Sequence, residues 1–401
     1  MGLEVRFRID YHKFMIERHL KIELLHLITE YPVVTLLGPR QAGKTTLARD
    51  VLVNYDYCNL EQPEMRQYAI DDPKAFLAQF KTNVILDEIQ RVPELLSYIQ
   101  VTVDKNKRNG QYVLTGSHQL ALREAITQSL AGRTSILNLL PFSIAELSAA
   151  GISFDSFESY IYQGFLPRIY DQQQRPTQAY SNYYQTYIER DVRQLINLKD
   201  LALFEKFMKL LAGRVGQLMD YSSLANDVGV SAKTIRHWLS ILEASFVVFK
   251  LTPYFENFGK RVVKSPKYYF IDTGLLTFLL GIEKPAQISR DPLVGQMFEN
   301  LVVIECLKNR TNQGRLSNLY FFRDSNGNEA DIVYQHGREL TLIEVKSSST
   351  YQSSMLKGLK NLKKLSPTMT QAYLIYAGEN LSFSHELDAL KYDQVGRVFL
   401  E

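Results

Sequence analysis

The sequence has few cysteines and no strong excess of charge of either sign. Cys58 and Cys306 are too few for a disulfide framework, and such low cysteine usage is typical of a reducing compartment. No apolar run reaches the length of a membrane span, and no secretory signal opens the chain. We therefore expect a cytoplasmic protein without a membrane partner. A net charge of +3 does not indicate nucleic-acid binding by itself, so that prediction must rest on local clusters.

The most specific motif present is a glycine-rich loop over residues 38–46. It follows an apolar run at 33–37 and leads into a helical pattern at 47–52, which is the order and spacing of a P-loop. Gly38 and Gly43 allow the backbone to wrap around a phosphate at the positive end of a helix. We predict ATP or GTP binding by the whole loop, through Gly38, Pro39, Arg40, Gln41, Ala42, Gly43, Lys44, Thr45 and Thr46.

An apolar strand that ends in two acids follows at residues 82–88. An acidic pair of this kind is weak evidence alone, but about forty residues after a P-loop it indicates a magnesium site. We predict that Lys44 contacts the β- and γ-phosphates, and that Thr45 and Asp87 hold Mg²⁺. Glu88 would orient and deprotonate the attacking water.

Two further candidates lie beside later strands. Ser117, at the end of a strand over 111–115, is our first choice for a contact with the γ-phosphate or the attacking water. Thr115 is the second choice, and simple turn residues are an equally good interpretation of both. Arg133 precedes another apolar strand and would stabilise transition-state charge, in cis or from a neighbouring subunit of a homo-oligomer. A solvated arginine is the alternative.

These motifs together resemble the prokaryotic AAA+-type ATPases that carry a "domain of unknown function 4143" (DUF4143) tail. The resemblance implies an ATPase core that uses ATP, a helical and winged-helix middle, and a nuclease-like C-terminal module, but no settled biological role. It rests on the segments 37–46, 86–93, 114–117, 130–133, 140–143, 164–167, 187–192 and 272–275.

We accordingly predict an α/β multidomain protein with four regions. Residues 1–150 would form an AAA+-like P-loop NTPase domain, and 151–212 a helical region. Residues 213–288 would form a winged helix-turn-helix, and 289–401 a PD-(D/E)xK restriction-endonuclease-like domain. In the helical region, tyrosines at helical spacing over 180–188 indicate helix packing, whereas the charged string 189–193 fits a solvated face or an intersubunit contact.

The winged-helix prediction rests on residues 221–239, where a short helix ends at Gly229 and Ser231 caps a second helix. Two extended segments then bracket a basic loop at 260–264, which would be a positive wing that contacts DNA phosphates. The alternative is a contact with protein rather than DNA. On the second helix we expect Ser231, Lys233, Thr234 and His237 to face the DNA groove, and Ile235, Leu239 and Leu242 to pack inward.

The C-terminal pattern is a helix over 294–308, three strands, a helix and a strand, which resembles the core of PD-(D/E)xK nucleases. Glu344 and Lys346 lie two apart on one strand and share a face. Asp331, on the preceding strand, can meet Glu344 across a hairpin. We predict that Asp331 and Glu344 bind Mg²⁺ or Mn²⁺ and that Lys346 acts on water or developing charge. The family pattern implies a further metal contact from Glu299.

The leading functional prediction is ATP-controlled binding of DNA, with cleavage or other processing by the C-terminal site. Two alternatives remain from the sequence. One is a non-cleaving ATP switch that keeps the nuclease fold for binding, and the other is a protein-remodelling ATPase whose winged helix contacts a partner chain.

Overall fold

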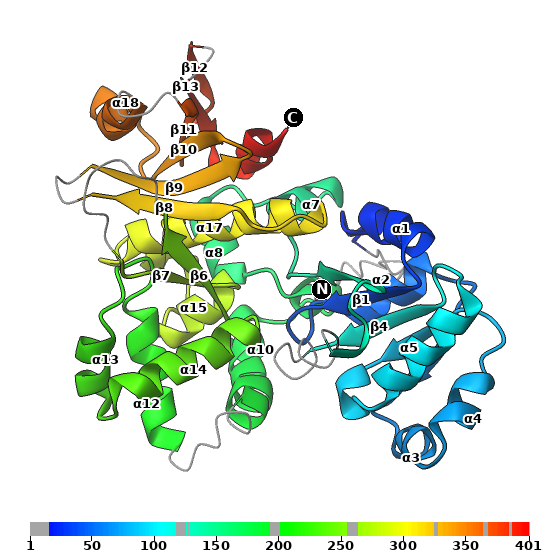
Figure 1. Ribbon diagram of the computed structural model, residues 1–401. Coiled ribbons are helices and arrows are strands. Elements are labelled where there is room, and N and C mark those ends of the chain that lie inside the picture. Colours follow the sequence, from blue (N-terminus) through cyan, green and yellow to red (C-terminus); the bar gives the residue numbers. More distant parts are fainter. Residues whose placement is uncertain are drawn as a thin grey trace, which may run out of the picture.

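The computed structural model describes residues 16–117, 126, 128–192, 201–254, 264–324, 328–363, 368–384 and 387–400. The P-loop part lies to one side of the molecule, and the middle and C-terminal parts are stacked on the other (Figure 1). None of the helices in these residues combines the length and the hydrophobicity needed to cross a bilayer.

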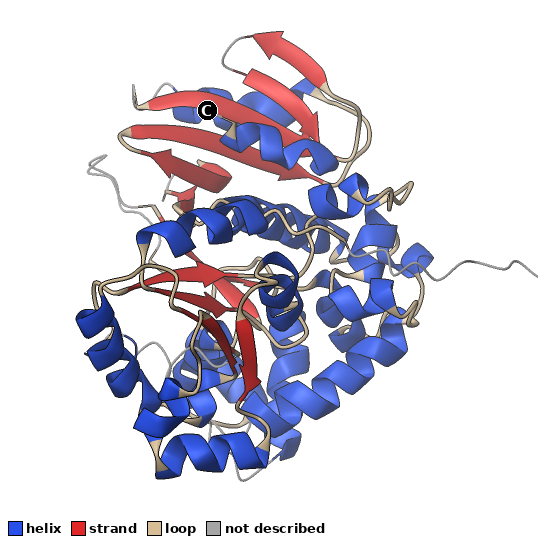
Figure 2. Ribbon diagram, turned by 90° about the vertical axis from the view of Figure 1, so that its right-hand side faces the viewer, coloured by secondary structure: helices blue, strands red, loops and turns tan. Residues whose placement is uncertain are grey.

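The P-loop part is built on a five-stranded parallel sheet in the order β2-β3-β4-β1-β5. Strand β1 is buried along its whole length, as expected for a central parallel strand covered on both faces. Figure 2 shows helices beside this sheet and beside the second sheet above it. The strands are β1 (Val33–Leu37), β2 (Asp56–Asn59), β3 (Val84–Asp87), β4 (Tyr112–Gly116) and β5 (Thr134–Asn138).

Helices connect these strands and lead out of the domain. Polar side chains at the carboxyl ends of β1, β3 and β4 share one edge of the sheet, because all the strands are parallel. The helical elements are α1 (Lys21–Glu30), α2 (Lys44–Val51), α3 (Pro63–Asp71), α4 (Pro73–Ala78), η1 (Ile89–Arg91), α5 (Leu95–Asn106) and α7 (Ile144–Ala149).

The middle part is mainly helical and contains an antiparallel strand pair, β6 with β7. Nine residues of it, Tyr184–Val192, form a π-helix, a rare conformation that often occurs near functional sites. Its elements are α8 (Phe157–Gln163), α9 (Pro167–Asp171), α10 (Pro176–Tyr183), η2 (Tyr184–Val192), α12 (Leu201–Ala212), α13 (Tyr221–Val228), α14 (Ala232–Ala244), β6 (Val248–Pro253), β7 (Lys267–Phe270), α15 (Thr273–Leu279) and α16 (Pro285–Ile288).

Helices α13 and α14 occupy the residues predicted for them. Gly229 adopts a left-handed conformation (φ 96°) at the end of α13, which glycine allows without a steric penalty. The Ser231 hydroxyl accepts a hydrogen bond from Thr234 N at 3.1 Å and caps α14. The expected burial is confirmed for Ile235, Leu239 and Leu242, which are fully buried. Ser231, Lys233 and His237 are exposed as predicted, whereas Thr234 is half-buried.

The C-terminal part contains a long helix, α17, packed against a sheet. Helix α17 continues four residues past its predicted end at 308, and three strands, a helix and a strand follow it in the predicted order. Strands β12 and β13 and the terminal helix η4 were not predicted. The elements are α17 (Val294–Asn312), β8 (Leu319–Arg323), β9 (Glu329–His336), β10 (Glu339–Lys346), η3 (Ser353–Leu356), α18 (Lys357–Lys363), β11 (Met369–Tyr376), β12 (Leu381–Ser384), β13 (Leu387–Lys391) and η4 (Tyr392–Phe399).

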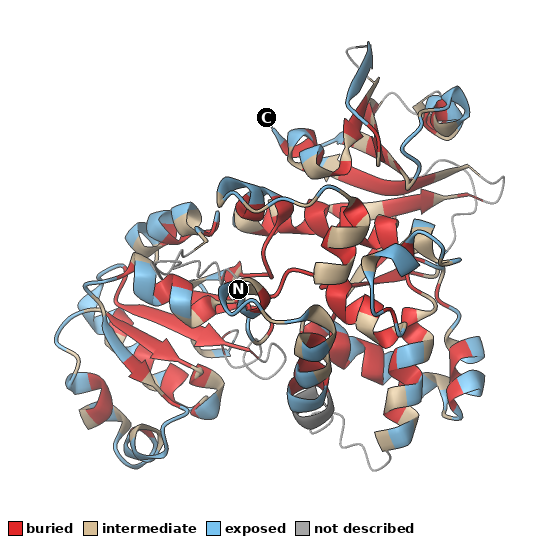
Figure 3. Cartoon of the chain, turned by 180° about the vertical axis from the view of Figure 1, so that it is seen from behind, coloured by how far each residue is buried: buried red, intermediate tan, exposed pale blue. Residues whose placement is uncertain are grey.

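The middle and C-terminal parts share one sheet. Strand β6 pairs in parallel with β8, with Thr252 opposite Tyr320 and Pro253 opposite Phe321. The resulting eight strands have the order β12-β13-β11-β10-β9-β8-β6-β7. One hydrophobic core also runs from Leu140 to the last helix, and Figure 3 shows α17 buried along much of its length inside it.

Candidate functional site

The P-loop has a closely packed backbone and a buried lysine. Lys44 begins α2, and its ammonium group donates to the carbonyls of Gly38 (3.0 Å) and Pro39 (2.9 Å). Burial lowers the pKa of Lys44 to about 8, although the charges of Glu88 and Asp87 oppose that shift. At Gly38 a Cβ atom would lie 2.1 Å from the Leu139 carbonyl oxygen, so this position excludes every larger residue.

Thr45 and Asp87 lie together, as predicted for a magnesium site. Thr45 Oγ1 is 2.9 Å from Asp87 Oδ2, and the Tyr57 hydroxyl donates to the same oxygen at 2.8 Å. Thr115, the second-choice residue of β4, donates to Asp87 Oδ1. A carboxylate beside a threonine hydroxyl is a donor set that suits a hard cation such as Mg²⁺. Tyr57 was missed, because it comes from the edge strand β2 and no motif marks it.

Glu88 follows β3 in a left-handed backbone conformation (φ 58°), which is unusual for a residue other than glycine. Its N–H donates to Thr115 Oγ1 at 3.2 Å, and Ser117 Oγ donates to Glu88 Oε2 at 3.2 Å. Gln90 also donates to this carboxylate. Thr115 of β4 therefore donates to the carboxylate of Asp87, whereas Ser117, which follows β4, donates to the carboxylate of Glu88.

Arg133 lies at the wrong end of the sheet for a role in its own P-loop. Its carbonyl accepts a hydrogen bond from Val33 N (3.2 Å), so it stands where β1 begins, roughly 15 Å of strand away from the loop. Its guanidinium pairs with both oxygens of Asp104, at 2.6 and 2.8 Å. This position contradicts a role for Arg133 in ATP hydrolysis by its own subunit. Arg133 precedes β5 whereas the P-loop follows β1, so the two lie at opposite edges of the parallel sheet. Action on a neighbouring subunit stays a prediction.

Side chains of the middle part border the P-loop. The guanidinium of Arg40 lies 5.8 Å from the ring centre of Tyr187, which belongs to the π-helix. The space beside Gly43 is limited by Pro167 of α9. Tyr180, Tyr183 and Tyr187 are buried, which confirms helix packing as their role. The side chains of residues 189–193 lie outside the described part, so both interpretations of that charged string stay open.

A second group of charged residues gathers where β9 and β10 separate. The register that pairs Ile332 with Ile343 brings Asp331 and Glu344 opposite each other one step further along. The Lys346 ammonium lies 2.6 Å from Glu344 Oε1 and 3.7 Å from Asp331 Oδ2. These three predicted residues therefore come together, and Lys346 lies between the two acids.

Strand β9 carries a bulge next to this group. Between Tyr320 and Phe322 of β8 there is one residue, whereas between their partners Val333 and Ala330 there are two. An extra residue of this kind bends a strand and turns nearby side chains, and such bulges are frequent beside active sites. Here the two intervening residues include Asp331.

Lys267 of β7 reaches the same group from the middle part. Its ammonium lies 3.1 Å from Glu299 Oε1 and 3.4 Å from Glu329 Oε1, and its side chain is almost completely buried. The Tyr269 hydroxyl also donates to Glu299. Glu299 therefore joins the group as the resemblance implied, but Lys267, Tyr269 and Glu329 were missed, because the pairing of β6 with β8 brings β7 close.

We refer to Glu299, Glu329, Asp331, Glu344, Lys267 and Lys346 as the C-terminal carboxylate cluster. Burial and then the charge of Asp331 raise the pKa of Glu299 and of Glu344 to about 7. Glu344 Oε2 is buried and has no hydrogen-bond partner within the described residues.

The carboxylate cluster differs in one respect from the predicted metal site. Across the described ranges, no set of three or more His, Cys, Asp or Glu side chains is arranged to hold a metal ion. The physical reason is that Lys267 and Lys346 pair with the carboxylates that were predicted as ligands. The donor chemistry still fits a hard cation, since Glu344 Oε2 is a buried carboxylate oxygen to which no described group donates.

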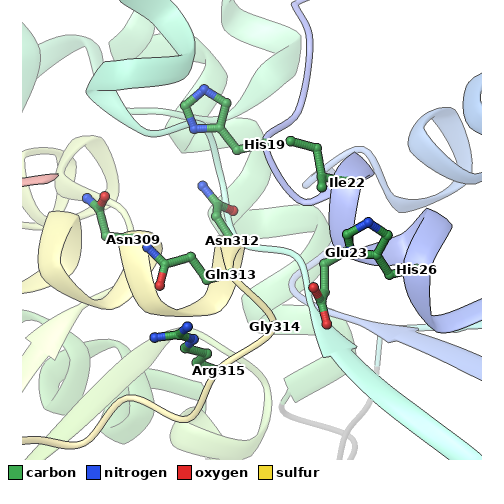
Figure 4. Close-up of a pocket in the computed structure, with 9 residues that line it drawn as sticks. All are labelled: His19, Ile22, Glu23, His26, Asn309, Asn312, Gln313, Gly314 and Arg315. Atoms are coloured by element: carbon green, nitrogen blue, oxygen red, sulfur yellow. The ribbon is translucent and has the colours of Figure 1, made fainter. Parts of the chain in front are cut away.

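A separate polar cleft of about 520 Å³ lies between α1 and the end of α17. Figure 4 shows residues of α1 facing the last turn of α17 and the loop after it. None of the residues predicted to carry chemistry lies in this cleft. Its lining is His19, Ile22, Glu23, His26, Asn309, Asn312, Gln313, Gly314 and Arg315.

The parallel sheet, the phosphate-binding loop and the acids beyond it define a P-loop nucleotide-binding protein. Residues 30–148 match a family model described as an AAA domain. Residues 154–286 and 294–394 match two domains of unknown function, DUF8612 and DUF4143. An uncharacterised protein of Mycobacterium tuberculosis is 30% identical over 369 residues, which cover 91% of this chain and 81% of that protein. The chain belongs to the family of AAA-type P-loop ATPases with a DUF4143 C-terminal region.

Other known proteins are similar over most of the chain. An uncharacterised protein of Haemophilus influenzae is 25% identical over 396 residues, covering 88% of this chain and 93% of that protein. Among solved structures, a Walker-type ATPase of Pyrococcus abyssi aligns with a TM-score of 0.45 and 15% identity, covering 69% of this chain and 99% of that one. The AAA-domain match supports ATP binding and ATPase activity in the first part of the chain.

Proposed function

We propose that this protein is an ATP-hydrolysing enzyme that binds DNA and cleaves or otherwise processes it at the C-terminal carboxylate cluster. The observation that carries the proposal is the convergence of Asp331, Glu344 and Lys346 at the end of two adjacent strands. Two carboxylates and an ammonium group supply the parts that metal-assisted phosphodiester hydrolysis requires.

The contacts at the P-loop support the following proposed roles. Lys44 binds the β- and γ-phosphates, and Thr45 and Asp87 hold Mg²⁺, which would neutralise charge on the phosphates. Glu88 accepts the proton of the attacking water. Ser117 holds the Glu88 carboxylate in place through the hydrogen bond at 3.2 Å. In this scheme the γ-phosphoryl group passes directly to water, and no side chain of the protein forms a covalent bond with it.

The proposed DNA contact is made by α14 and by the loop between β6 and β7. Lys233 and His237 are exposed on α14, and Lys264 is exposed at the end of that loop. Lys260 and Arg261, the other basic residues of the predicted wing, lie outside the described residues. The helix pair followed by an antiparallel strand pair supports a winged-helix interpretation of this part.

At the C-terminal cluster, Asp331 and Glu344 are the proposed ligands of Mg²⁺ or Mn²⁺, and Lys346 orients water or offsets developing charge. The bound ion would polarise the phosphate and activate water. In the described part of the chain, four carboxylates of the cluster face three cationic groups, because Arg323 also pairs with Glu329 at 3.7 Å. When all four carboxylates are ionised, one negative charge stays uncompensated, which favours the binding of a cation. Lys267 pairs with Oε1 of Glu299, so Glu299 would act as a further ligand through its other oxygen.

One observation favours a second candidate function. Lys267 and Lys346 already pair with Glu299 and Glu344, and these pairs would persist in a protein that uses its cluster for binding alone. The second candidate is therefore an ATP-dependent DNA-binding switch that does not cleave.

The test is to incubate the purified 401-residue chain with supercoiled plasmid and with linear duplex DNA, with and without ATP, in Mg²⁺ or Mn²⁺. Metal-dependent cleavage that disappears in Asp331→Asn supports the nuclease proposal. Binding of DNA that depends on ATP, with no cleavage under any combination, would instead establish the switch and remove the nuclease.

A further inference from the structure

Arg18 lies directly behind the P-loop, although it belongs to no motif of the sequence. It precedes α1, and only 7% of its surface is exposed. Each of its guanidinium nitrogens donates a hydrogen bond. Nη1 donates to the Ala42 carbonyl (2.7 Å), Nη2 to the Leu140 carbonyl (2.6 Å) and Nε to Glu146 Oε1 (3.1 Å). One side chain thus joins the P-loop to α7 and to the connection that leads into it.

The position of the guanidinium is fixed from several sides. Glu146 accepts further hydrogen bonds from His19 N and Ser143 N, both at 2.8 Å. Burial by itself would raise the pKa of Glu146, but the charge of Arg18 and these hydrogen bonds outweigh burial and hold that pKa below its usual value. The guanidinium also lies 4.8 Å from the ring centre of Phe142. An ion pair with so many partners has little freedom to move.

The bond to Ala42 determines where the next N–H points. A trans peptide is planar, so its N–H is directed away from its C=O. The Ala42 carbonyl points at Arg18, and the Gly43 N–H of the same peptide therefore points to the opposite side. Gly43 has φ 89°, which lets the backbone turn into α2 immediately afterwards. In a P-loop, that side of the backbone faces the phosphates.

We propose that Arg18 is a positioning residue for ATP: by holding the Ala42 carbonyl, it aims the Gly43 N–H at the nucleotide phosphates. This inference rests on the ATPase function supported above and adds a residue to it. Arg18 contacts the loop on the side away from the Gly43 N–H, so it acts on ATP affinity and leaves the chemical step to Glu88.

The test compares Arg18→Gln with the parent for ATP affinity, KM, kcat and Tm. We expect the dissociation constant and the KM for ATP to rise roughly ten- to hundredfold, as for the removal of one hydrogen bond to a charged group. At saturating ATP, kcat should change much less, because Glu88 and Asp87 keep their contacts. If Arg18→Gln does not fold, Arg18→Lys replaces it, with the same expectation for KM. It keeps the charge opposite Glu146 but lacks the planar fork.

The matched control is Lys308→Met, which breaks a second buried ion pair. Lys308 Nζ lies 2.8 Å from Glu305 Oε1 on α17, and Lys308 is even more deeply buried than Arg18. This variant should have a lower Tm while the KM for ATP stays at the parental value. An unchanged KM in folded Arg18→Gln or Arg18→Lys, beside an active parent, would overturn the inference alone. A parent that binds no ATP would overturn the ATPase function as well.

Discussion

Asp331 Oδ2 accepts a hydrogen bond from the backbone N–H of Val345 at 2.8 Å. Backbone pairing between β9 and β10 ends at Ile332 and Ile343. Beyond that pair, the Asp331 side chain forms the next hydrogen bond between the two strands. The bond holds the Asp331 carboxylate against β10, on the strand that carries Glu344. A carboxylate fixed in this way needs little rearrangement to act as a ligand.

Substitutions at the P-loop should separate binding from hydrolysis. Lys44→Ala removes the ammonium from the phosphates, so ATP binding should be abolished, as measured by calorimetry. Glu88→Gln keeps the shape of the side chain but cannot accept a proton, so it should bind ATP and hydrolyse it at least a hundredfold more slowly, an estimate on the order of the effect of removing a general base. Parental ATP affinity in Lys44→Ala would refute the P-loop assignment.

The lowered pKa of Lys44 predicts a pH dependence of ATP affinity. The ammonium form contacts phosphate, and a group with a pKa of about 8 loses its proton as the pH rises through that value. ATP binding above it must therefore take up a proton, and affinity should fall towards tenfold per pH unit. Calorimetry in two buffers of different ionisation enthalpy measures that uptake. In Lys44→Arg the charge persists, so any remaining affinity should not depend on pH over this range.

The basic loop after β6 should control general affinity for DNA. Replacing Lys260, Arg261 and Lys264 together by glutamine should weaken binding to all sequences alike. The slope of log affinity against log salt should become shallower by about 0.9 for each phosphate that the variant no longer neutralises. Fluorescence anisotropy over a salt series measures both quantities.

A triple substitution of equal charge provides the control for that loop. Lys105, Lys107 and Arg108 are exposed at the end of α5, in the P-loop part of the chain. Their replacement by glutamine should leave DNA affinity nearly unchanged. Equal reductions of affinity in the two triple variants would mean that the loop has no special role.

The carboxylate cluster should fail as a unit. Asp331→Asn should abolish metal-dependent cleavage, because too few hard oxygen ligands remain. Lys346→Ala should keep the metal but abolish most cleavage, since the lysine acts on water and charge. ATP hydrolysis without DNA should be unaffected in both. Glu339→Gln, at the exposed start of β10, is the control and should cleave normally. Parental cleavage by Asp331→Asn would exclude this site.

The raised pKa of Glu344 predicts how stability varies with pH in metal-free protein. A carboxyl whose pKa rises from 4.5 to about 7 on folding binds its proton more tightly in the native state. Its contribution to the free energy of unfolding is full below about pH 4.5 and disappears as the pH rises through about 7. Glu344→Gln should roughly halve this fall, and Glu299 should account for the rest. The test is to measure Tm at several pH values in the presence of a chelator. If the slope of Tm against pH is the same in Glu344→Gln and in the parent, the prediction is wrong.

Local patterns predicted most elements because each depends on nearby residues. The P-loop, β8 and the helices α13 and α14 follow from glycine spacing, apolar runs and a serine cap. The two acids at the end of β3 were also predictable, because the carboxyl ends of parallel strands lie at the same edge of the sheet as the P-loop. The distance between Arg133 and the P-loop of its own subunit was also predictable from the sequence. A residue before a parallel strand lies at the edge opposite the P-loop.

Long-range contacts were not predictable in the same way. Lys267 meets Glu299 only because β6 joins β8, and no local pattern specifies which strand edges will pair. Arg18 reaches Glu146 across 128 positions of sequence, and a single buried arginine has no periodicity that marks it. Both residues became visible only when the packing of distant segments was known.

The pairing of β6 with β8 has a consequence for how such a chain can be inherited. A recombination event near residue 289 would separate two strands that complete each other's hydrogen bonds, and would divide one hydrophobic core. The free edge of β8 would then be open to pairing with other chains, a common route to aggregation. Gene fusions that exchange only residues 289–401 should therefore be selected against, and the segment from Leu140 onwards should be inherited as one unit.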